Sequence, residues 1–146
     1  MTTKYSIECW IIAPDQSVLL LQVPARPGKH TAFWQPVTGG IEAGESPQQA
    51  VLREISEETG LRLTLDDVRE ITTGLDVVIS PDLTVSKTLF LARTPTLDVV
   101  TNPDEHQDHQ WTEPALVPEA LYWDSNRETW AMIQKHLAAT GTGHDA

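Results

Sequence analysis

Three glutamates crowd one short stretch of this 146-residue chain, REISEETGL at residues 53–61. If the stretch is helical, Glu54, Glu57 and Glu58 project into one sector, with their Cβ atoms about 5–6 Å apart. Carboxylates at that separation repel one another, and the chain already carries a formal net charge of -11. A cluster of hard oxygen ligands suits Mg²⁺ or Mn²⁺, which remove the repulsion and attract phosphate oxygens. The alternative interpretation is a solvated acidic face.

The residues around these acids predict a helix over residues 46–59. Ser46 can cap its start, Pro47 suits its first position and Gly60 can end it. One side of this helix is apolar, through Ala50, Val51, Leu52 and Ile55. That side favours packing on a sheet, so the acids are expected at a junction between a Gly-rich loop and a helix.

Further elements follow from hydrophobic patterns and turn residues. Strands are predicted at residues 6–12, 17–23, 68–79, 83–93 and 108–112, with a last helix at 125–139. Strands with two interposed helices predict an α+β fold, in which a mixed sheet is covered on both faces. We expect one domain over residues 1–139 and a disordered tail over 140–146.

Charge and composition exclude several classes of function. Lys and Arg number 10 against 21 Asp and Glu, so a sequence-independent grip on nucleic acid is not expected. The single cysteine, Cys9, excludes an internal disulfide and a Cys-rich zinc site, and its apolar surroundings predict burial. No basic leader and no membrane-spanning apolar run are present, so a soluble, cytoplasmic protein is expected.

The spacing of the acids carries a family resemblance. Gly39, five residues, Glu45, seven residues and then REISEETGL match the signature of the Nudix hydrolases, which cleave nucleoside diphosphates linked to another moiety. The resemblance implies an α/β/α sandwich with a mixed sheet between helices. It also implies a diphosphatase in which metal-activated water attacks phosphorus in line, without a covalent enzyme intermediate.

The resemblance implies a role for each matching position. The metal ligands would be Glu54, Glu57 and Glu58, together with a backbone carbonyl at Thr38 or Gly39, and Glu57 would also be catalytic. The expected cofactor is Mg²⁺, with Mn²⁺ as the other choice.

Two further positions of the motif look structural. Arg53 and Glu45 resemble the pair that ties the loop to the helix in this family, so we expect neither of them to bind substrate.

A second acidic segment, DEHQDHQW at residues 104–111, resembles a segment that supplies a further carboxylate in many family members. Glu105 is therefore predicted to be a metal ligand or the general base, the alternative being an exposed loop acid. His106 and His109 lack the companions of a zinc site and are interpreted as surface residues or hydrogen-bond partners.

The substrate class rests on two weaker resemblances. FWQPVTGG before the motif and DSNRETW at residues 124–130 are similar to segments of bacterial dihydroneopterin triphosphate diphosphatases. Val23 and Pro24 stand where that branch tends to carry arginine, which leaves the substrate open. A nucleoside or pterin triphosphate is expected, the alternatives being a dinucleoside polyphosphate, a nucleotide sugar or ADP-ribose. A non-catalytic nucleotide sensor is disfavoured because every glutamate of the motif is kept.

Several side chains are candidates for contact with this small-molecule substrate: Arg26, Lys29, Trp34, Thr38, Asn126 and Arg127. The positive loop at 24–33 can equally be a plain connection, and Trp34, like Trp10, can stack on a flat ring or belong to the core. Ser125 can cap the last helix and leave its two neighbours idle. No nucleic acid or membrane partner is expected, and the protein is expected to be a monomer or a homodimer.

Overall fold

The structure of the chain is a computed structural model that describes residues 1–141, with only the backbone described at 140 and 141. In chain order the elements are β1 (Thr2–Ile12), β2 (Val18–Val23), β3 (Phe33–Gln35), β4 (Val37–Gly40), α1 (Pro47–Thr59), η1 (Leu65–Asp67), β5 (Val68–Ser80), β6 (Leu83–Arg93), β7 (Asp108–Thr112), η2 (Pro114–Leu116), α2 (Val117–Ala120) and α3 (Asp124–Gly141).

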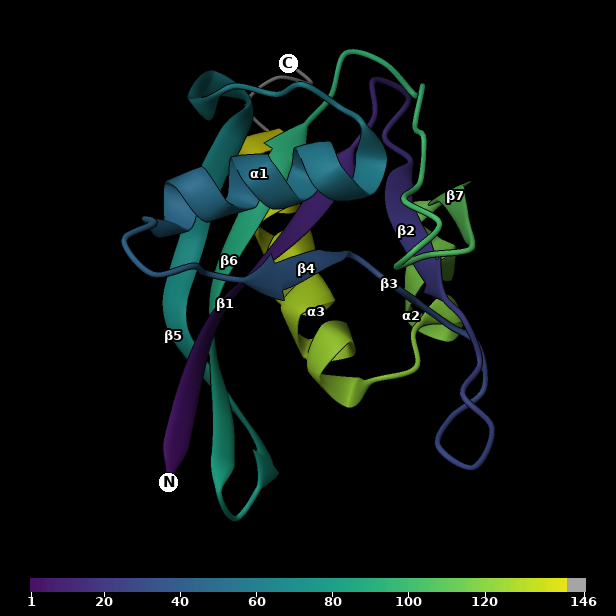
Figure 1. Cartoon of the computed structure of the whole chain (residues 1–146). Helices are drawn as coiled ribbons and strands as arrows, with labels where there is room; N and C mark the ends of the chain where they lie inside the picture. Colours follow the sequence, from purple (N-terminus) through teal and green to yellow (C-terminus); the bar gives the residue numbers. More distant parts are fainter. Residues whose placement is uncertain (142–146) are drawn as a thin grey trace.

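One mixed sheet forms the middle layer of the molecule (Figure 1). Its main strand order is β3-β2-β1-β6-β5, in which β1 and β6 run parallel and the other neighbours run antiparallel. Beside β1, β4 pairs with residues 6–9, whereas β2 pairs further along, at Ile12, and also carries β7. The sheet therefore forks next to β1, and β2 and β4 form the two branches.

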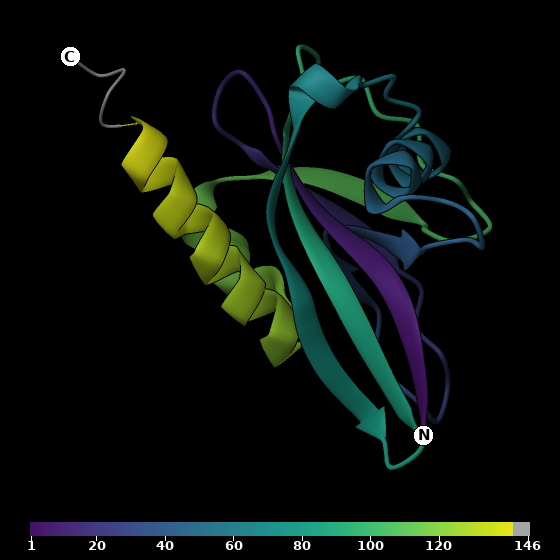
Figure 2. The same ribbon diagram turned by 90° about the vertical axis from the view of Figure 1, so that its left-hand side faces the viewer.

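Alternating side chains along β1 divide the core between the two faces of the sheet. Ile7, Cys9 and Ile11 belong to the buried cluster under α1, whereas Trp10 and Ile12 belong to the cluster under α3. Figure 2 shows the two helices on opposite sides of the sheet. This arrangement confirms the predicted α+β sandwich with helices on both faces.

Helix α1 has the ends that the sequence predicts. The Ser46 hydroxyl accepts from the Gln49 backbone N–H at 3.1 Å, and the Gln49 side chain accepts from the Ser46 N–H at 2.9 Å. This reciprocal pair is a capping box, which satisfies two backbone donors that the first turn would leave unpaired. Gly60 ends the helix with φ of 73°, a left-handed conformation that costs glycine little.

The predicted strands at 68–79, 83–93 and 108–112 are confirmed as β5, β6 and β7. The first strand begins at Thr2, earlier than its apolar pattern predicts, because its polar first half pairs in register with β6.

The predictions miss the short strands β3 and β4 and end the last helix too early. The strands β3 and β4, which form the segment FWQPVTGG, are too short to show alternation. The last helix continues two residues beyond its predicted end, to Gly141. Of the tail predicted to be disordered, 140–146, residues 140 and 141 continue this helix, and residues 142–146 lie outside the described part of the chain. No helix within residues 1–141 is long and apolar enough to cross a membrane.

Candidate active site

Arg53 joins the strand, the loop and the helix that make up the motif. Its guanidinium donates to both carboxylate oxygens of Glu45, from Nε at 2.8 Å and from Nη2 at 2.9 Å. Nη2 also donates to the carbonyl oxygen of Gly40, at 2.9 Å. The hydrogen bonds from Arg53 hold the pKa of Glu45 down at about 2. One bidentate pair therefore fixes the loop against the start of the acidic helix.

The same guanidinium compensates two acids of α1. Its Nη1 donates to Oε1 of Glu54 at 2.7 Å and to Oε2 of Glu57 at 3.2 Å. Arg53 thus supplies the positive charge for Glu54, which is buried, and for Glu57, which is exposed.

Gly39 allows the backbone of β4 to approach Glu54 directly. A Cβ atom built on Gly39 would lie 2.1 Å from Cδ of Glu54, a separation that non-bonded carbon atoms do not reach. Any side chain at this position would displace the carboxylate. Glycine at this position therefore leaves the space that the Glu54 carboxylate occupies.

Glu58 is the most enclosed acid of the cluster, with 1% of its surface exposed. Neither of its carboxylate oxygens has a hydrogen-bond partner among residues 1–141. Burial, followed by the adjacent Glu54 carboxylate and then Glu105, raises the pKa of Glu58 to about 10, and the smaller effect of the nearby Thr38 backbone opposes this rise. Buried carboxylates as a rule have hydrogen-bond donors or cations beside them, so this one fits a cation as its partner.

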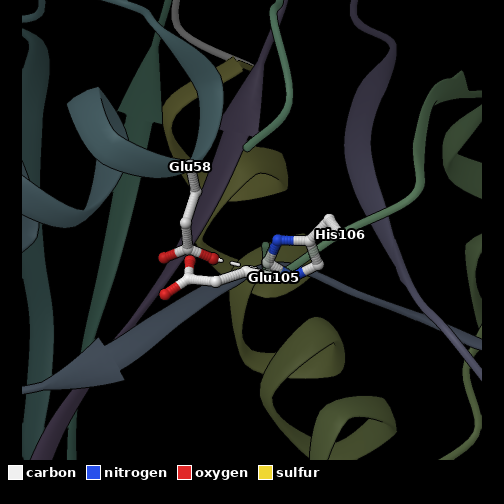
Figure 3. A group of neighbouring side chains, drawn as sticks. All are labelled: Glu58, Glu105 and His106. Atoms are coloured by element: carbon white, nitrogen blue, oxygen red, sulfur yellow. Dashed lines mark ion pairs between the residues drawn. The ribbon is translucent and has the colours of Figure 1, made fainter. Parts of the chain in front are cut away.

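Glu105 reaches the cluster from the loop before β7. One ligand atom from each of Glu58, Glu105 and His106 lies within 4.8 Å of the other two. Figure 3 shows these three side chains pointing toward one another. Partial burial and then the acids Glu54 and Glu57 raise the pKa of Glu105. The loop therefore brings a fourth carboxylate close to the three glutamates of α1, although Glu105 lies far from the motif in the sequence.

His106 is the unexpected member of this group. The expectation of a surface residue is wrong, because only 3% of it is exposed, whereas the hydrogen-bond alternative agrees with its contact to Gln35 at 3.3 Å. Its Nε2 lies 3.7 Å from Oε1 of Glu58. Burial lowers the pKa of His106, which favours the neutral imidazole over a charged partner for Glu58.

These groups fit a divalent cation. Arg53 compensates Glu54 and Glu57, but within residues 1–141 no arginine or lysine forms an ion pair with Glu58 or Glu105. Carboxylate oxygens are the ligands that Mg²⁺ and Mn²⁺ accept, and the neutral imidazole beside them brings no positive charge that would replace such an ion. The unpaired oxygens of Glu58 are the observation that favours such an ion over a plain acidic surface.

Two cavities adjoin at this site. The first, of about 380 Å³, is lined by Val23, Gln35, Thr38, Gly39, Gly40, Glu54, Glu58, Glu105 and His106. The second, of about 530 Å³, is lined by Glu8, Gln35, Thr38, Val77, Val78, Ile79, Val85, Lys87, Trp123, Asp124, Ser125 and Asn126. Gln35 and Thr38 line both, so the acidic cavity continues into a more apolar one. Each has the size of a small-molecule site.

Some of the predicted substrate contacts lie in these cavities. Thr38 lines both of them, and Asn126 lines the second. Asn126 is 6% exposed and donates from Nδ2 to Oε1 of Glu8 at 3.0 Å.

Four other candidates lie elsewhere. The Arg127 guanidinium donates to the carbonyl oxygens of Pro118, at 3.1 Å, and Leu121, which fastens the start of α3 to the α2 segment. Trp34 packs against the core cluster under α3, and Arg26 and Lys29 are exposed on the loop between β2 and β3. None of the four lines either cavity. Trp10 is fully buried, which favours its core interpretation, and the predicted burial of Cys9 is confirmed.

The sequence interpretation missed the polar floor of the second cavity. Glu8 is 1% exposed and forms an ion pair with Lys87 across 2.7 Å. Trp123, which lines the same cavity, was also missed. A single acid inside the apolar stretch SIECWII, and a single lysine inside VSKTLFLA, are the signals that could have indicated a buried pair.

Comparisons with known proteins agree with this geometry. Residues 2–132 match the NUDIX domain family. Nucleoside triphosphatase NudI of Salmonella typhimurium is 31% identical over 124 residues, which cover 80% of this chain and 86% of that protein. The structure of the E. coli dihydroneopterin triphosphate pyrophosphohydrolase has a TM-score of 0.65 and 25% identity, covering 89% of this chain and 95% of that one.

Another relative is a longer protein. The octanoyltransferase of Myxococcus xanthus is 37% identical over 117 residues, which cover 80% of this chain but 32% of that protein. This chain therefore matches only about a third of the octanoyltransferase, and the name of that protein describes its full length.

A sheet between helices and an acidic helix clamped to a glycine strand define a class of hydrolases that act on diphosphate bonds. The chain belongs to the Nudix family, which confirms the resemblance predicted from the spacing of the motif. It is a Nudix hydrolase acting on nucleoside diphosphate derivatives.

Proposed function

We propose that this chain is a Mg²⁺-dependent diphosphatase that hydrolyses a nucleoside or pterin triphosphate. The observation that carries the proposal is the buried carboxylate of Glu58, which lies beside Glu105 and a glycine strand and whose two oxygens have no hydrogen-bond partner within residues 1–141. Mn²⁺ is the other ion that suits the same ligands. The similarity to NudI and to the pterin enzyme supports a triphosphate as substrate.

In this proposal the metal ligands are Glu54, Glu57 and Glu58, with a backbone carbonyl at Thr38 or Gly39, and Glu105 is either a further ligand or the general base. A bound Mg²⁺ would neutralise the diphosphate and lower the pKa of water beside it.

The side chains around that ion have separate tasks. Glu105 is the proposed general base, because its carboxylate has a raised pKa and lies on the solvent side of the cluster, where it can accept a proton from water. Glu57, on the exposed side of α1, is the alternative base. Arg53 and Glu45 hold the helix in a fixed position against the glycine strand while substrate binds.

A panel of substrates tests the proposal. Nucleoside triphosphates, dihydroneopterin triphosphate, ADP-ribose, a nucleotide sugar and a dinucleoside polyphosphate would be assayed with Mg²⁺, with Mn²⁺ and with EDTA, for released phosphate and diphosphate. We expect diphosphate release from a triphosphate that depends on the added metal. Preferred cleavage of ADP-ribose or a dinucleoside polyphosphate would overturn the triphosphate assignment, and turnover in EDTA would overturn the metal site.

A further inference from the structure

Glu8 is the centre of a buried polar group on the α3 side of the sheet. Its Oε1 accepts from Nζ of Lys87 at 2.7 Å and from Nδ2 of Asn126 at 3.0 Å. Its Oε2 accepts from Nε1 of Trp10 at 3.0 Å and from the hydroxyl of Thr129. Four donors saturate this carboxylate, so Glu8 itself has no free oxygen to offer a ligand.

The donors that Glu8 holds are oriented by it. Asn126 must turn its NH₂ group to the carboxylate, which leaves Oδ1 as the acceptor that it offers to the cavity. Lys87 donates one hydrogen bond in the described structure, to Glu8, although its ammonium has three N–H groups. The floor of the cavity therefore presents a cationic donor next to a fixed amide acceptor.

Much of the wall of the same cavity is apolar, although Asp124 and Ser125 also line it. Val77 and Val85 come from β5 and β6, and Trp123 precedes α3 on the other side. The Trp123 ring is held edge-on by Tyr122 and Phe33, with ring centroids 4.7 Å and 5.8 Å away. Aliphatic and aromatic walls above a small set of polar groups suit a flat heterocycle.

We infer that this cavity recognises the lactam edge of the substrate's heterocycle, with Lys87 donating to the ring carbonyl and Asn126 accepting from the adjacent ring N–H. Glu8 is a positioning residue that holds both groups. The inference rests on the proposed function, because the shared residues Gln35 and Thr38 connect this cavity to the acidic one that would hold the phosphates.

The predicted selectivity among bases follows from the order of hydrogen-bond donors and acceptors along the edge of each base. Guanine, uracil and the pterin ring present a carbonyl oxygen beside a ring N–H, which matches the two groups. Adenine and cytosine present an amino group beside a ring nitrogen acceptor, so Lys87 would face a donor and Asn126 would face a lone pair. A buried mismatch of this kind leaves protein groups unpaired and is strongly disfavoured.

Size-matched substrate pairs test the inference. We expect kcat/KM for dGTP over dATP, and for dUTP over dCTP, to favour the lactam member by about 10-fold or more, the cost of one charged hydrogen bond. Binding of the α,β-methylene analogues of the same four nucleotides, measured by titration calorimetry with Mg²⁺, should show the same order without turnover.

Variants of Lys87 test the residue assignment. Lys87→Met keeps the straight stem and removes the donor, and it should reduce both selectivity ratios to near one. Because it leaves Glu8 without its cation, the double variant Glu8→Gln with Lys87→Met provides a neutral pair in case the single variant does not fold. Lys135→Met, on the exposed side of α3, is the matched control and should keep both ratios.

The outcomes separate the two proposals. Equal kcat/KM and equal affinity for both members of each pair would overturn the lactam assignment while leaving the diphosphatase intact. Selectivity that persists in both Lys87 variants would overturn the role of Lys87. If no triphosphate is cleaved but the methylene analogues of dGTP and dUTP still bind preferentially, the proposed reaction fails and the lactam site stands.

Discussion

Two carboxylates, Glu8 and Glu58, are equally buried in this protein, each 1% exposed, and they lie in opposite environments. Four donors surround Glu8 on the α3 side of the sheet. Neither oxygen of Glu58, on the α1 side, has a partner among the described residues. A saturated carboxylate can only hold its neighbours in place, whereas an unsaturated one retains its capacity to bind a ligand.

The difference also separates binding from chemistry. The Glu8 group is complete before any ligand arrives, so it can recognise a shape without reorganising. In the Glu58 cluster the acids repel one another, and a bound cation would relieve that repulsion. The stability of the protein should therefore depend on the ion. Replacing each carboxylate by its amide should therefore affect stability at Glu8 and catalysis at Glu58.

Glu8→Gln should destabilise the fold by about 3–5 kcal/mol, the usual cost of removing one member of a buried ion pair. The substitution leaves Lys87 charged and buried, and it replaces an acceptor with a donor. Urea unfolding measures the change, with Glu128→Gln on the exposed side of α3 as the matched control. A decrease of less than about 1 kcal/mol in the free energy of unfolding would contradict the stabilising role of the Glu8–Lys87 pair.

Glu58→Gln should have the reverse profile. We expect kcat to fall by more than about 100-fold, since outer-shell partners of a metal already cost 10–100-fold. The free energy of unfolding without metal should not fall at neutral pH, because the raised pKa keeps Glu58 protonated there and the variant replaces a neutral acid with a neutral amide of nearly the same shape. Assays and melting curves with and without Mg²⁺ give both numbers. A variant as active as the parent, or one that still gains the parent's increase in Tm from Mg²⁺, would contradict a metal role for Glu58.

Gly39→Ala tests the contact between β4 and the cluster. The new Cβ would overlap the Glu54 carboxylate, so Glu54 must move and kcat should fall by about 10-fold or more. At Gly40 a Cβ would meet nothing within 4 Å, so Gly40→Ala should lose much less activity. Equal losses in the two variants would show that the clash at Glu54 is not what matters.

The Glu58 cluster was predictable from the sequence. Glu54, Glu57 and Glu58 lie on one helix, so local spacing alone determines that they are neighbours. Their clamp by Arg53 also depends on residues within the motif. Glu105 was predicted through a second resemblance, and the structure brings it to Glu58.

The group around Glu8 was not predictable from local spacing in the sequence. Glu8 and Lys87 are 79 positions apart, and Glu8 and Asn126 are 118 apart, so only the pairing of β1 with β6 and the docking of α3 bring them together. Trp34 was a candidate because it lies beside the motif. The alternation of β3 instead directs it toward the α3 core.

The smallest expected effect concerns acid stability, where Glu45 and Glu58 should act with opposite sign. The folded pKa of Glu45 is lowered to about 2 from an ordinary 4.5, so its stabilisation is present above pH 4.5 and is lost as the pH falls toward 2. The folded pKa of Glu58 is raised from 4.5, so the folded state holds its proton longer than the unfolded state does. Its contribution therefore decreases as the pH rises above 4.5.

Unfolding free energies of the parent, Glu45→Gln and Glu58→Gln, measured in EDTA from pH 3 to pH 8, isolate the two contributions as differences from the parent. The parent's advantage over Glu45→Gln should shrink in acid, and its stability relative to Glu58→Gln should decline as the solution becomes more alkaline. Saturating Mg²⁺ should abolish the second trend, because a cation beside Glu58 favours the ionised carboxylate in the folded state. Parallel curves for the parent and Glu58→Gln in EDTA would mean that the buried carboxylate is compensated by something other than a metal, and the contrast with Glu8 would then lose its basis.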